Sequence, residues 1–200
     1  TEPGCWVPLL RADKIVLAGD HQQLPPTVLS AEAARQGFAK SLMERQVELY
    51  GDEIAKMLKV QYRMHHQIMN FSSNQFYDGK LVAHQSVIDH KLPDIDTVTK
   101  TDFTSETVTF IDTAGAGWEE ELEPEGLSKR NPKEAALVLQ KVKLLIDAGL
   151  PASEIAVIAP YAAQVRLLRD QFEWDPENKG QRLEIDTVDG FQGREKEAVV

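Results

Sequence analysis

The fold is decided first by residues 14–26, which read KIVLAGDHQQLPP. Residues 14–18 of this stretch form a short apolar run that predicts a buried strand of a parallel sheet. Ligands of open α/β sheets bind beyond the carboxyl ends of the strands, so residues 19–26 lie where a ligand would be met. Gly19 allows a sharp turn there, and Pro25 and Pro26 fix the direction in which the loop leaves the sheet.

Two side chains that follow this strand carry useful chemistry. Asp20 can accept a hydrogen bond from a metal-bound water or cap a neighbouring loop. The Gln23 amide both donates and accepts, so it can donate to a phosphate oxygen while it accepts from an attacking water. The pair Gly19–Asp20 alone favours an ordinary turn, whereas residues 19–26 together are far more specific.

Composition predicts an intracellular globular protein. The 200 residues are 42% hydrophobic, which suits one medium domain or pieces of two. Because no apolar run reaches roughly 18 residues, we expect no membrane span and no membrane partner. Cys5 is the single cysteine and no signal-peptide pattern precedes it, so a reducing compartment is natural, in the cytoplasm, the nucleus or both.

The net charge of -10 disfavours a protein that binds nucleic acid through a general basic surface. It is compatible with a motor that has a narrow local nucleic-acid groove. One cysteine and five dispersed histidines argue against a structural zinc site, and no metal ligands are predicted in the chain. The pair Asp52–Glu53 follows no apolar strand, so we expect a solvated turn there and not a magnesium site.

The second half of the chain alternates strands with helices. Apolar or alternating runs predict strands at residues 107–112, 155–159, 183–188 and 197–200. Helical periodicity predicts one helix between Asn131 and Gly149. A second helix is expected around three apolar positions: Val165, Leu168 and Phe172. This alternation is typical of a parallel sheet with helices on both faces, and it predicts an α/β fold.

The first half has fewer regular signals. A helical region is expected between Ser30, which offers an N-cap, and Gly51, which offers a stop. A short strand is expected at residues 58–60. The next segment has apolar residues at helical spacing: Met64, Ile68 and Phe71. Two polar segments are expected to be surface loops: residues 78–105 and the acidic run at 119–125.

Unusual residues follow several of the expected strands. They are Gln23, Tyr62–Arg63, Pro160–Tyr161 and residues 187–195. In the last of these, Gly190 and Gly193 permit tight turns. Taken alone, residues 187–195 are as compatible with an ordinary charged loop as with a site.

Four of these stretches together resemble motifs of the superfamily 1 helicases. Residues 19–26 resemble motif III, and residues 61–64, which read QYRM, resemble motif IIIa. Residues 159–161, APY, together with Gln164 resemble motif IV, and residues 188–196, VDGFQGREK, resemble motif V. The motifs occur in the order of that family. The resemblance is closest to the immunoglobulin-mu-binding-protein (SMUBP) branch of the 5′-to-3′ group, near the nonsense-mediated-decay helicases.

The resemblance implies two RecA-like domains that bind ATP in the cleft between them. Residues 1–59 would be the C-terminal part of the first domain, and residues 60–200 would be the second domain, truncated before motif VI. The implied activity is ATP-dependent movement along single-stranded DNA or RNA. The implied partners are that nucleic acid strand and the rest of a longer helicase chain.

The same resemblance implies a role for individual residues. Gln23 would sense the γ-phosphate and Arg63 would act as an arginine finger, so both are candidate catalytic residues. Tyr62 would stack on adenine, Glu195 would bind the ribose hydroxyls, and Gly193 would lie in the same ATP site. Four further residues would contact the nucleic-acid strand: Pro160, Tyr161, Thr187 and Val188.

Parts of such a motor are missing from the sequence. It contains no Gly-x-x-x-x-Gly-Lys-Ser/Thr phosphate cradle, and the main ligands of ATP and Mg²⁺ would lie outside residues 1–200. We therefore expect an internal helicase fragment that is inactive alone. Two other interpretations are open: a non-catalytic, degenerate nucleotide-binding scaffold, and an unrelated α/β enzyme with a phosphate site at its strand ends. A phosphate cradle in the flanking sequence would eliminate both.

Overall fold

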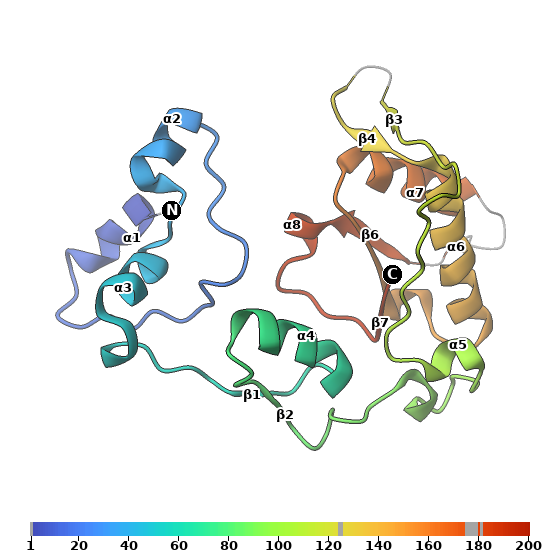
Figure 1. The fold of residues 1–200 in the computed structure, drawn as a ribbon, viewed down its shortest axis with the longest axis horizontal. Coiled ribbons are helices and arrows are strands. Elements are labelled where there is room, and N and C mark those ends of the chain that lie inside the picture. Colours follow the sequence, from blue (N-terminus) through green and yellow to red (C-terminus); the bar gives the residue numbers. More distant parts are fainter. Residues whose placement is uncertain (1, 124–125, 175–179, 181) are drawn as a thin grey trace. The chain divides into compact units, whose positions relative to one another are not determined.

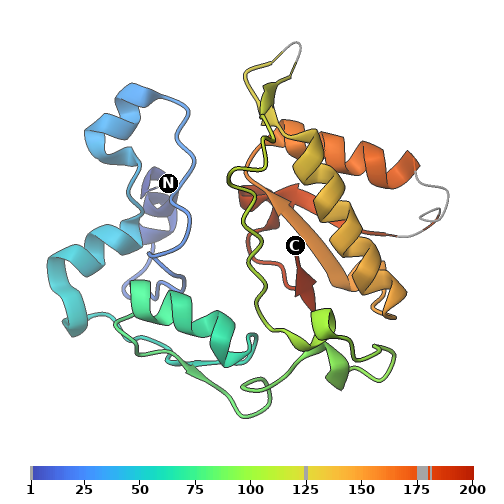
Figure 2. The ribbon, with the colours of Figure 1, turned by 45° about the vertical axis from the view of Figure 1, so that its right-hand side comes forward.

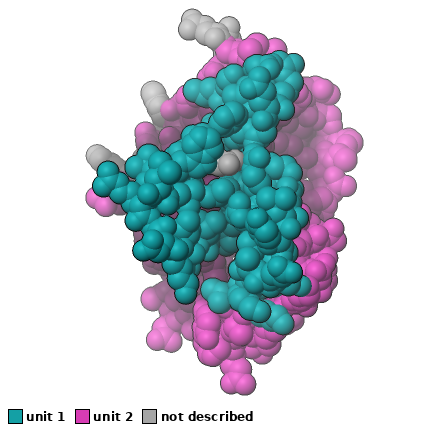
Figure 3. Space-filling view, turned by 90° about the vertical axis from the view of Figure 1, so that its left-hand side faces the viewer, with its two compact units in different colours: residues 1–59 teal, residues 60–200 magenta. Residues whose placement is uncertain are grey.

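The computed structural model describes residues 2–123, 126–174, 180 and 182–200. The chain divides into two compact units, residues 1–59 and residues 60–200 (Figure 3). The order of their helices and strands can be followed by colour in Figure 1.

Unit 1, residues 1–59, is helical in its described part. Its elements are α1 (Glu2–Leu9), α2 (Ala31–Ala33), η1 (Ala34–Phe38), α3 (Leu42–Tyr50) and η2 (Gly51–Glu53). The Ser30 hydroxyl accepts a hydrogen bond from the Ala33 amide at 3.2 Å and caps α2. Ser41 caps α3 in the same way, and Gly51 ends it at a positive φ of 51°. The predicted helical region between Ser30 and Gly51 is therefore confirmed.

The predicted strand at residues 14–18 is wrong. No strand is present in the described residues 2–59, and Val16 is 85% exposed. A strand exists only where its backbone N–H and C=O groups pair with a neighbour, and no strand among the described residues 2–59 pairs with residues 14–18. The Asp52–Glu53 pair lies in the exposed turn η2, as expected.

Unit 2, residues 60–200, begins with a small parallel pair and a helix. β1 (Val60–Gln61) pairs with β2 (Val82–Ala83), and α4 (His66–Phe76) lies between them in sequence. The helix is predicted correctly, but its apolar face is not. Met69 and Ser73 are buried, whereas Ile68 and Phe71 are exposed. Ser73 faces inward because its hydroxyl accepts a hydrogen bond from the Leu81 amide at 3.2 Å.

The middle of unit 2 corrects three expectations. Residues 78–105 are more than a surface loop, because they contain β2, η3 (Leu92–Asp94), α5 (Asp102–Ser105) and the buried core residue Val98. Residues 107–112 form no strand. Part of the acidic run forms β3 (Glu121–Leu122), which pairs with β4 (Lys129–Arg130) in an antiparallel hairpin. Ion pairs of Glu120 with Lys129 and of Glu121 with Arg130 explain why acidic residues form this strand. Residues 124 and 125 lie outside the described residues.

The main sheet of unit 2 is parallel, in the order β6-β5-β7. Its strands are β5 (Ile155–Ala159), β6 (Glu184–Thr187) and β7 (Ala198–Val199). The connecting elements are α6 (Pro132–Asp147), η4 (Ala152–Glu154), α7 (Ala162–Trp174) and α8 (Val188–Phe191). The α/β fold class is therefore confirmed. β6 ends one residue earlier than predicted because Val188 starts α8, which the Thr187 hydroxyl caps.

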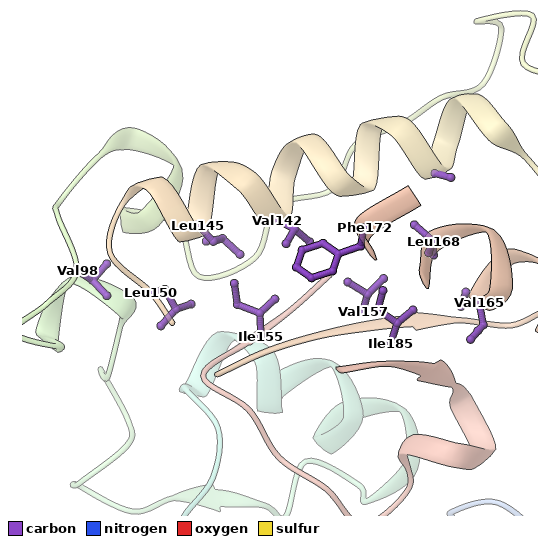
Figure 4. Packing of buried hydrophobic residues seen from close by; sticks show 12 residues of the cluster. Val98, Val142, Leu145, Leu150, Ile155, Val157, Val165, Leu168, Phe172 and Ile185 are labelled. Carbon is purple, nitrogen blue, oxygen red and sulfur yellow. The ribbon is translucent and has the colours of Figure 1, made fainter. Parts of the chain in front are cut away.

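One hydrophobic cluster holds α6 and α7 against the sheet (Figures 2 and 4). α6 contributes Ala135, Val142 and Leu145, and α7 contributes Val165, Leu168 and Phe172. β5 contributes Ile155 and Val157, which are at most 1% exposed. Burying each side chain of this size stabilises the fold by roughly 1.5–3 kcal/mol, so this cluster dominates the stability of unit 2.

The helix α4 begins at a histidine cap. The Nδ1 atom of His65 accepts a hydrogen bond from the Gln67 backbone N–H at 3.1 Å. Because a protonated imidazole has no acceptor nitrogen, this cap requires neutral His65. Burial lowers the pKa of the His65 imidazole below its ordinary value, and neighbouring His66 and Lys91 lower it further.

We expect His65→Asn to flatten the pH dependence of stability. The unfolded chain binds a proton at His65 more readily than the folded chain does. The contribution of His65 to the free energy of unfolding is therefore full above the unfolded pKa of about 6.5 and declines as the pH falls below it. Asn keeps an N-cap oxygen that does not titrate. Denaturant unfolding from about pH 7 to pH 5 should show a smaller loss in the variant. Parallel curves would contradict the assignment, and His21→Asn, at an exposed histidine of unit 1, is the control.

Candidate nucleotide-binding and nucleic-acid-binding sites

The turn at residues 61–64 is built around the side-chain amide of Gln61. Its Oε1 accepts hydrogen bonds from the backbone N–H groups of Arg63 at 2.8 Å and Met64 at 2.7 Å. Its Nε2 donates to the Met64 carbonyl oxygen at 2.7 Å. These three bonds close the turn on itself and turn Tyr62 and Arg63 outward, where both are exposed.

The Arg63 guanidinium meets Glu195, which lies 132 positions later in the chain. Nε of Arg63 donates to Oε2 of Glu195 at 2.6 Å. The side chains are 54% and 66% exposed, so the ion pair contributes only about 0–1 kcal/mol. A ligand that offers a better anion to Arg63 and hydroxyl donors to Glu195 could therefore separate them at little cost.

Glu195 reaches Arg63 while its two neighbours in the chain, Arg194 and Lys196, contact a different carboxylate. Arg194 and Lys196 both pair with Glu184 on β6, and Lys196 also donates to the Ser153 carbonyl oxygen at 2.6 Å. The hydrogen bond from Arg194 lowers the pKa of the Glu184 carboxyl below its usual range. The two basic side chains thus hold the loop to the sheet and direct Glu195 to the other side.

Two glycines shape the start of this loop. A Cβ at Gly190 would clash with the Asp186 carboxylate, so any larger residue there would require that side chain to move. Gly193 has a φ of 84°, in the left-handed region that glycine favours. Because Gly193 comes two residues before Glu195, its backbone conformation sets the direction of the segment that carries the carboxylate.

The carboxyl ends of β5 and β6 bring the predicted nucleic-acid residues together. The parallel register pairs Ala159 with Thr187, so Pro160 and Val188 come directly after the ends of two adjacent strands. Tyr161 and Val188 are about half exposed, and the Thr187 hydroxyl accepts from the Gly190 amide at 3.2 Å. The arrangement presents one aromatic ring and backbone groups, which suits stacking and backbone contacts more than sequence readout.

Gln164 supports this strand end from α7. Its Oε1 accepts from the Asn131 backbone N–H at 2.8 Å, and its Nε2 donates to the Asn131 carbonyl oxygen at 3.2 Å. Asn131 in turn caps α6 through the Lys133 and Glu134 amides. The glutamine that resembles part of motif IV thus ties the starts of two helices together.

In unit 1, Gln23 lies in a turn that Asp20 organises. One Asp20 carboxylate oxygen accepts from the Gln22 backbone N–H at 3.0 Å, and the other accepts from Nε2 of Gln23 at 3.1 Å. Asp20 therefore caps its own loop, which is one of the two roles expected from the sequence. The Gln23 side chain is exposed and held by a single intramolecular donor bond.

Two protein-family models match this chain. A family model described as AAA domain matches residues 38–200, and a second model of the same description matches residues 1–31. The chain belongs to the AAA-domain family. Together the two matches cover all but residues 32–37 of this AAA-domain chain.

Curated relatives of the AAA-domain chain confirm its resemblance to superfamily 1 helicases. DNA-binding protein SMUBP-2 of Mesocricetus auratus is 52% identical over 199 residues, which cover all of this chain and 20% of the relative. DNA polymerase alpha-associated DNA helicase A of Schizosaccharomyces pombe is 41% identical over 205 residues, with 30% of the relative covered. The Regulator of nonsense transcripts 1 homolog of Arabidopsis thaliana is 36% identical over 204 residues, with 16% covered. The AAA-domain chain spans less than a third of each.

Among the described residues, three side chains could together hold a metal: His65, His66 and Asp89, whose candidate ligand atoms lie within 4.8 Å of one another. Their hydrogen bonds point to a structural role instead. Nδ1 of His65 accepts the helix-capping bond, so its neutral ring carries the proton on Nε2. Nδ1 of His66 donates to the Ile88 carbonyl oxygen at 2.8 Å. A metal on His65 would have to displace the capping hydrogen bond at Nδ1 or the proton at Nε2.

Every helix in the described residues is too short or too polar to cross a membrane.

Within unit 2, the structure brings Arg63 and Glu195 into contact, with Tyr62 adjacent in the chain. The supporting role of Gln61 was missed, although its position directly before Tyr62–Arg63 was a usable signal. A side-chain amide can satisfy both N–H and C=O groups of a short turn, which few other residues can do.

We expect Gln61→Ala to lower the free energy of unfolding of unit 2 by about 1–3 kcal/mol, because three hydrogen bonds of the turn are lost. Denaturant unfolding of the chain measures this change. The matched control is Gln67→Ala, which removes an exposed amide side chain from α4. Equal destabilisation by both substitutions would show that the Gln61 amide does not hold the turn.

Proposed function

We propose that this AAA-domain chain is part of an ATP-dependent helicase or translocase that moves along single-stranded DNA or RNA. In this proposal, residues 1–59 are the C-terminal part of the first RecA-like domain and residues 60–200 are most of the second. The observation that carries the proposal is the contact between Arg63 and Glu195, with Tyr62 in the same turn. Groups suited to phosphate, ribose and base thus come from two distant segments to one place in unit 2.

The residues present fit a nucleoside triphosphate. A guanidinium matches phosphate oxygens in geometry and charge, a carboxylate accepts from ribose hydroxyls, and an exposed ring offers a face to a planar base. We assign these contacts to Arg63, Glu195 and Tyr62, with Gly193 in the same loop, while Gln23 of unit 1 would orient the attacking water. When bound, ATP supplies the γ-phosphoryl group and Mg²⁺ neutralises the charge that develops on it.

The separable Arg63–Glu195 pair suggests how this half of the site receives its ligand. When the ligand binds, the two side chains would separate. Arg63 would then bind a phosphate group, and Glu195 would accept hydrogen bonds from ribose hydroxyls. Because both side chains are more than half exposed, the ion pair between them contributes little to stability, and breaking it costs little free energy. The nucleotide can therefore enter without unfolding the loop that Arg194 and Lys196 hold to β6.

We assign the nucleic-acid strand to the carboxyl ends of β5 and β6, at Pro160, Tyr161, Thr187 and Val188. Contacts to the backbone and stacking on the Tyr161 ring would tolerate any sequence, as a motor requires. The relatives' names include DNA-binding protein and DNA helicase, which supports a nucleic-acid partner. We propose the cytoplasm, the nucleus or both as the location, together with the remainder of a longer helicase chain as a partner.

A degenerate scaffold and an unrelated α/β enzyme are the competing functions. Neither requires Arg63 to take part in phosphoryl transfer. A phosphate cradle encoded beside this chain, with ATP hydrolysis that single strands stimulate, would exclude both.

We expect Arg63→Ala in the longer helicase to lower kcat by roughly 10³- to 10⁵-fold, because an arginine finger stabilises transition-state charge. Arg63→Lys should lose most turnover as well, since an ammonium cannot bridge two phosphate oxygens as a guanidinium does. Single-turnover hydrolysis at saturating ATP and single strand measures the change, and strand binding without ATP should persist. The control is Arg35→Ala, which removes an exposed ion pair in unit 1. A wild-type rate for Arg63→Ala would end the proposal.

Gln23→Ala should slow hydrolysis more than it weakens ATP binding, because the amide acts when water and γ-phosphate align. The measurements are kcat and the equilibrium Kd for ATP in the longer helicase. Gln22→Ala removes the adjacent exposed amide and is the matched control. Unchanged kcat and Kd in the Gln23 variant would exclude it from the site.

A further inference from the structure

We propose that His84 is a positioning residue that holds the Tyr62 ring for a planar purine base. This inference rests on the proposed function, because it concerns the base-binding part of the same site. The resemblance to helicases gave His84 no role, and residues 78–105 were expected to be a surface loop. The argument comes from the strand register, the ring contact and the hydrogen bonds of His84.

The parallel pairing of β1 and β2 places the two rings side by side. Val60 pairs with Val82 and Gln61 pairs with Ala83, so the next residues in register are Tyr62 and His84. The His84 backbone N–H donates to the Gln61 carbonyl oxygen at 2.9 Å, which extends the ladder to this point. Side chains alternate along strands, so residues 62 and 84 project to the face opposite Gln61 and Ala83.

The rings are in contact at this register. Their centroids are 4.3 Å apart and their planes are tilted by 31°, so the two rings lie in direct contact. Tyr62 as a residue is 65% exposed, so the imidazole covers only part of it. Enough of the phenol ring therefore remains open to receive a second flat ring.

Ser86 fixes the orientation of the imidazole. The Ser86 backbone N–H donates to Nδ1 of His84 at 3.2 Å, and the Ser86 hydroxyl oxygen lies 2.9 Å from the same nitrogen. The Val87 and Ile88 amides donate to the His84 carbonyl oxygen at 3.0 Å, so the backbone of this turn is also held. A ring held at its edge and at its backbone is a firm support for Tyr62.

Support of this kind improves binding by reducing the ordering cost. An exposed tyrosine that turns freely must be immobilised when a base stacks on it, and that immobilisation weakens binding. His84 restricts the tyrosine before the base arrives. Because the base is unchanged during phosphoryl transfer, the gain applies equally to the ground state and the transition state, and it appears in Kd and KM rather than in kcat.

Two substitutions at His84 separate ring support from turn formation. His84→Asn keeps an oxygen acceptor for the Ser86 N–H, as in an Asx-turn, but removes the ring. His84→Phe keeps a flat ring beside Tyr62 but removes the acceptor. We expect His84→Asn in the longer helicase to raise Kd and KM for ATP by about two- to tenfold with kcat unchanged, and His84→Phe to stay near wild type.

Inorganic tripolyphosphate, which has no base, distinguishes a loss of base stacking from a general loss of structure. A general loss of structure would weaken tripolyphosphate binding, whereas a loss of stacking would not. Its inhibition constant should be the same in wild type and in His84→Asn. A parallel loss of tripolyphosphate and ATP affinity would overturn the inference, as would tight ATP binding by His84→Asn with weak binding by His84→Phe. Phe110→Ala removes an exposed ring elsewhere in unit 2 and is the control for aromatic truncation.

Tyr62→Ala distinguishes this inference from the proposed function. If Tyr62→Ala leaves ATP affinity unchanged, the assignment of the base site fails and the inference fails with it. If Tyr62→Ala weakens ATP binding but His84→Asn does not, only the role of His84 is excluded. In the double variant, His84→Asn should add little to the loss from Tyr62→Ala, because the support has no ring left to hold. Fully additive losses would refute the coupling.

Discussion

Unit 2 depends on the burial of one short strand, β5. It pairs with β6 on one side and β7 on the other, and its residues Ile155, Ala156 and Val157 are at most 1% exposed. A shift by one residue would exchange its two faces, and Ala156 would then replace a larger side chain, Ile155 or Val157, in the cluster with α6 and α7. The register that places Ala159 beside Thr187 is therefore fixed by hydrophobic burial along β5, and the positions of the strand-end residues follow from it.

Long, periodic elements were the ones that could be predicted from the sequence. α6, β5 and α7 carry their apolar residues at the spacing of their own structure, and each buries that face in the same cluster. Residues 14–18 and 107–112 have equally good local patterns but form no strands in the described structure. A strand depends on a partner as well as on its own residues, and nothing in a local pattern shows whether that partner is present.

The candidate sites likewise contain residues that the sequence pointed to and supporting residues that it did not. The resemblance to helicases pointed to Tyr62, Arg63 and Glu195 as candidates by residue type and order, but it could not show that Arg63 and Glu195 touch across 132 positions. The hidden supports were harder to find. Gln61 closes a turn with its amide, and His65 caps a helix although histidine is an uncommon N-cap residue. Both act through backbone groups, whose positions a one-dimensional pattern does not contain.

The alternation of side chains at residues 194–196 makes the length of this segment as important as its composition. Arg194 and Lys196 can both reach Glu184 only because one residue separates them, and that residue is the one directed at Arg63. A residue inserted or deleted within this segment would disturb both sets of contacts together, the two basic side chains on Glu184 and the carboxylate on Arg63. The loop therefore couples its attachment to the sheet with the presentation of Glu195, so a change in its length would alter the anchor and the candidate ribose contact at once.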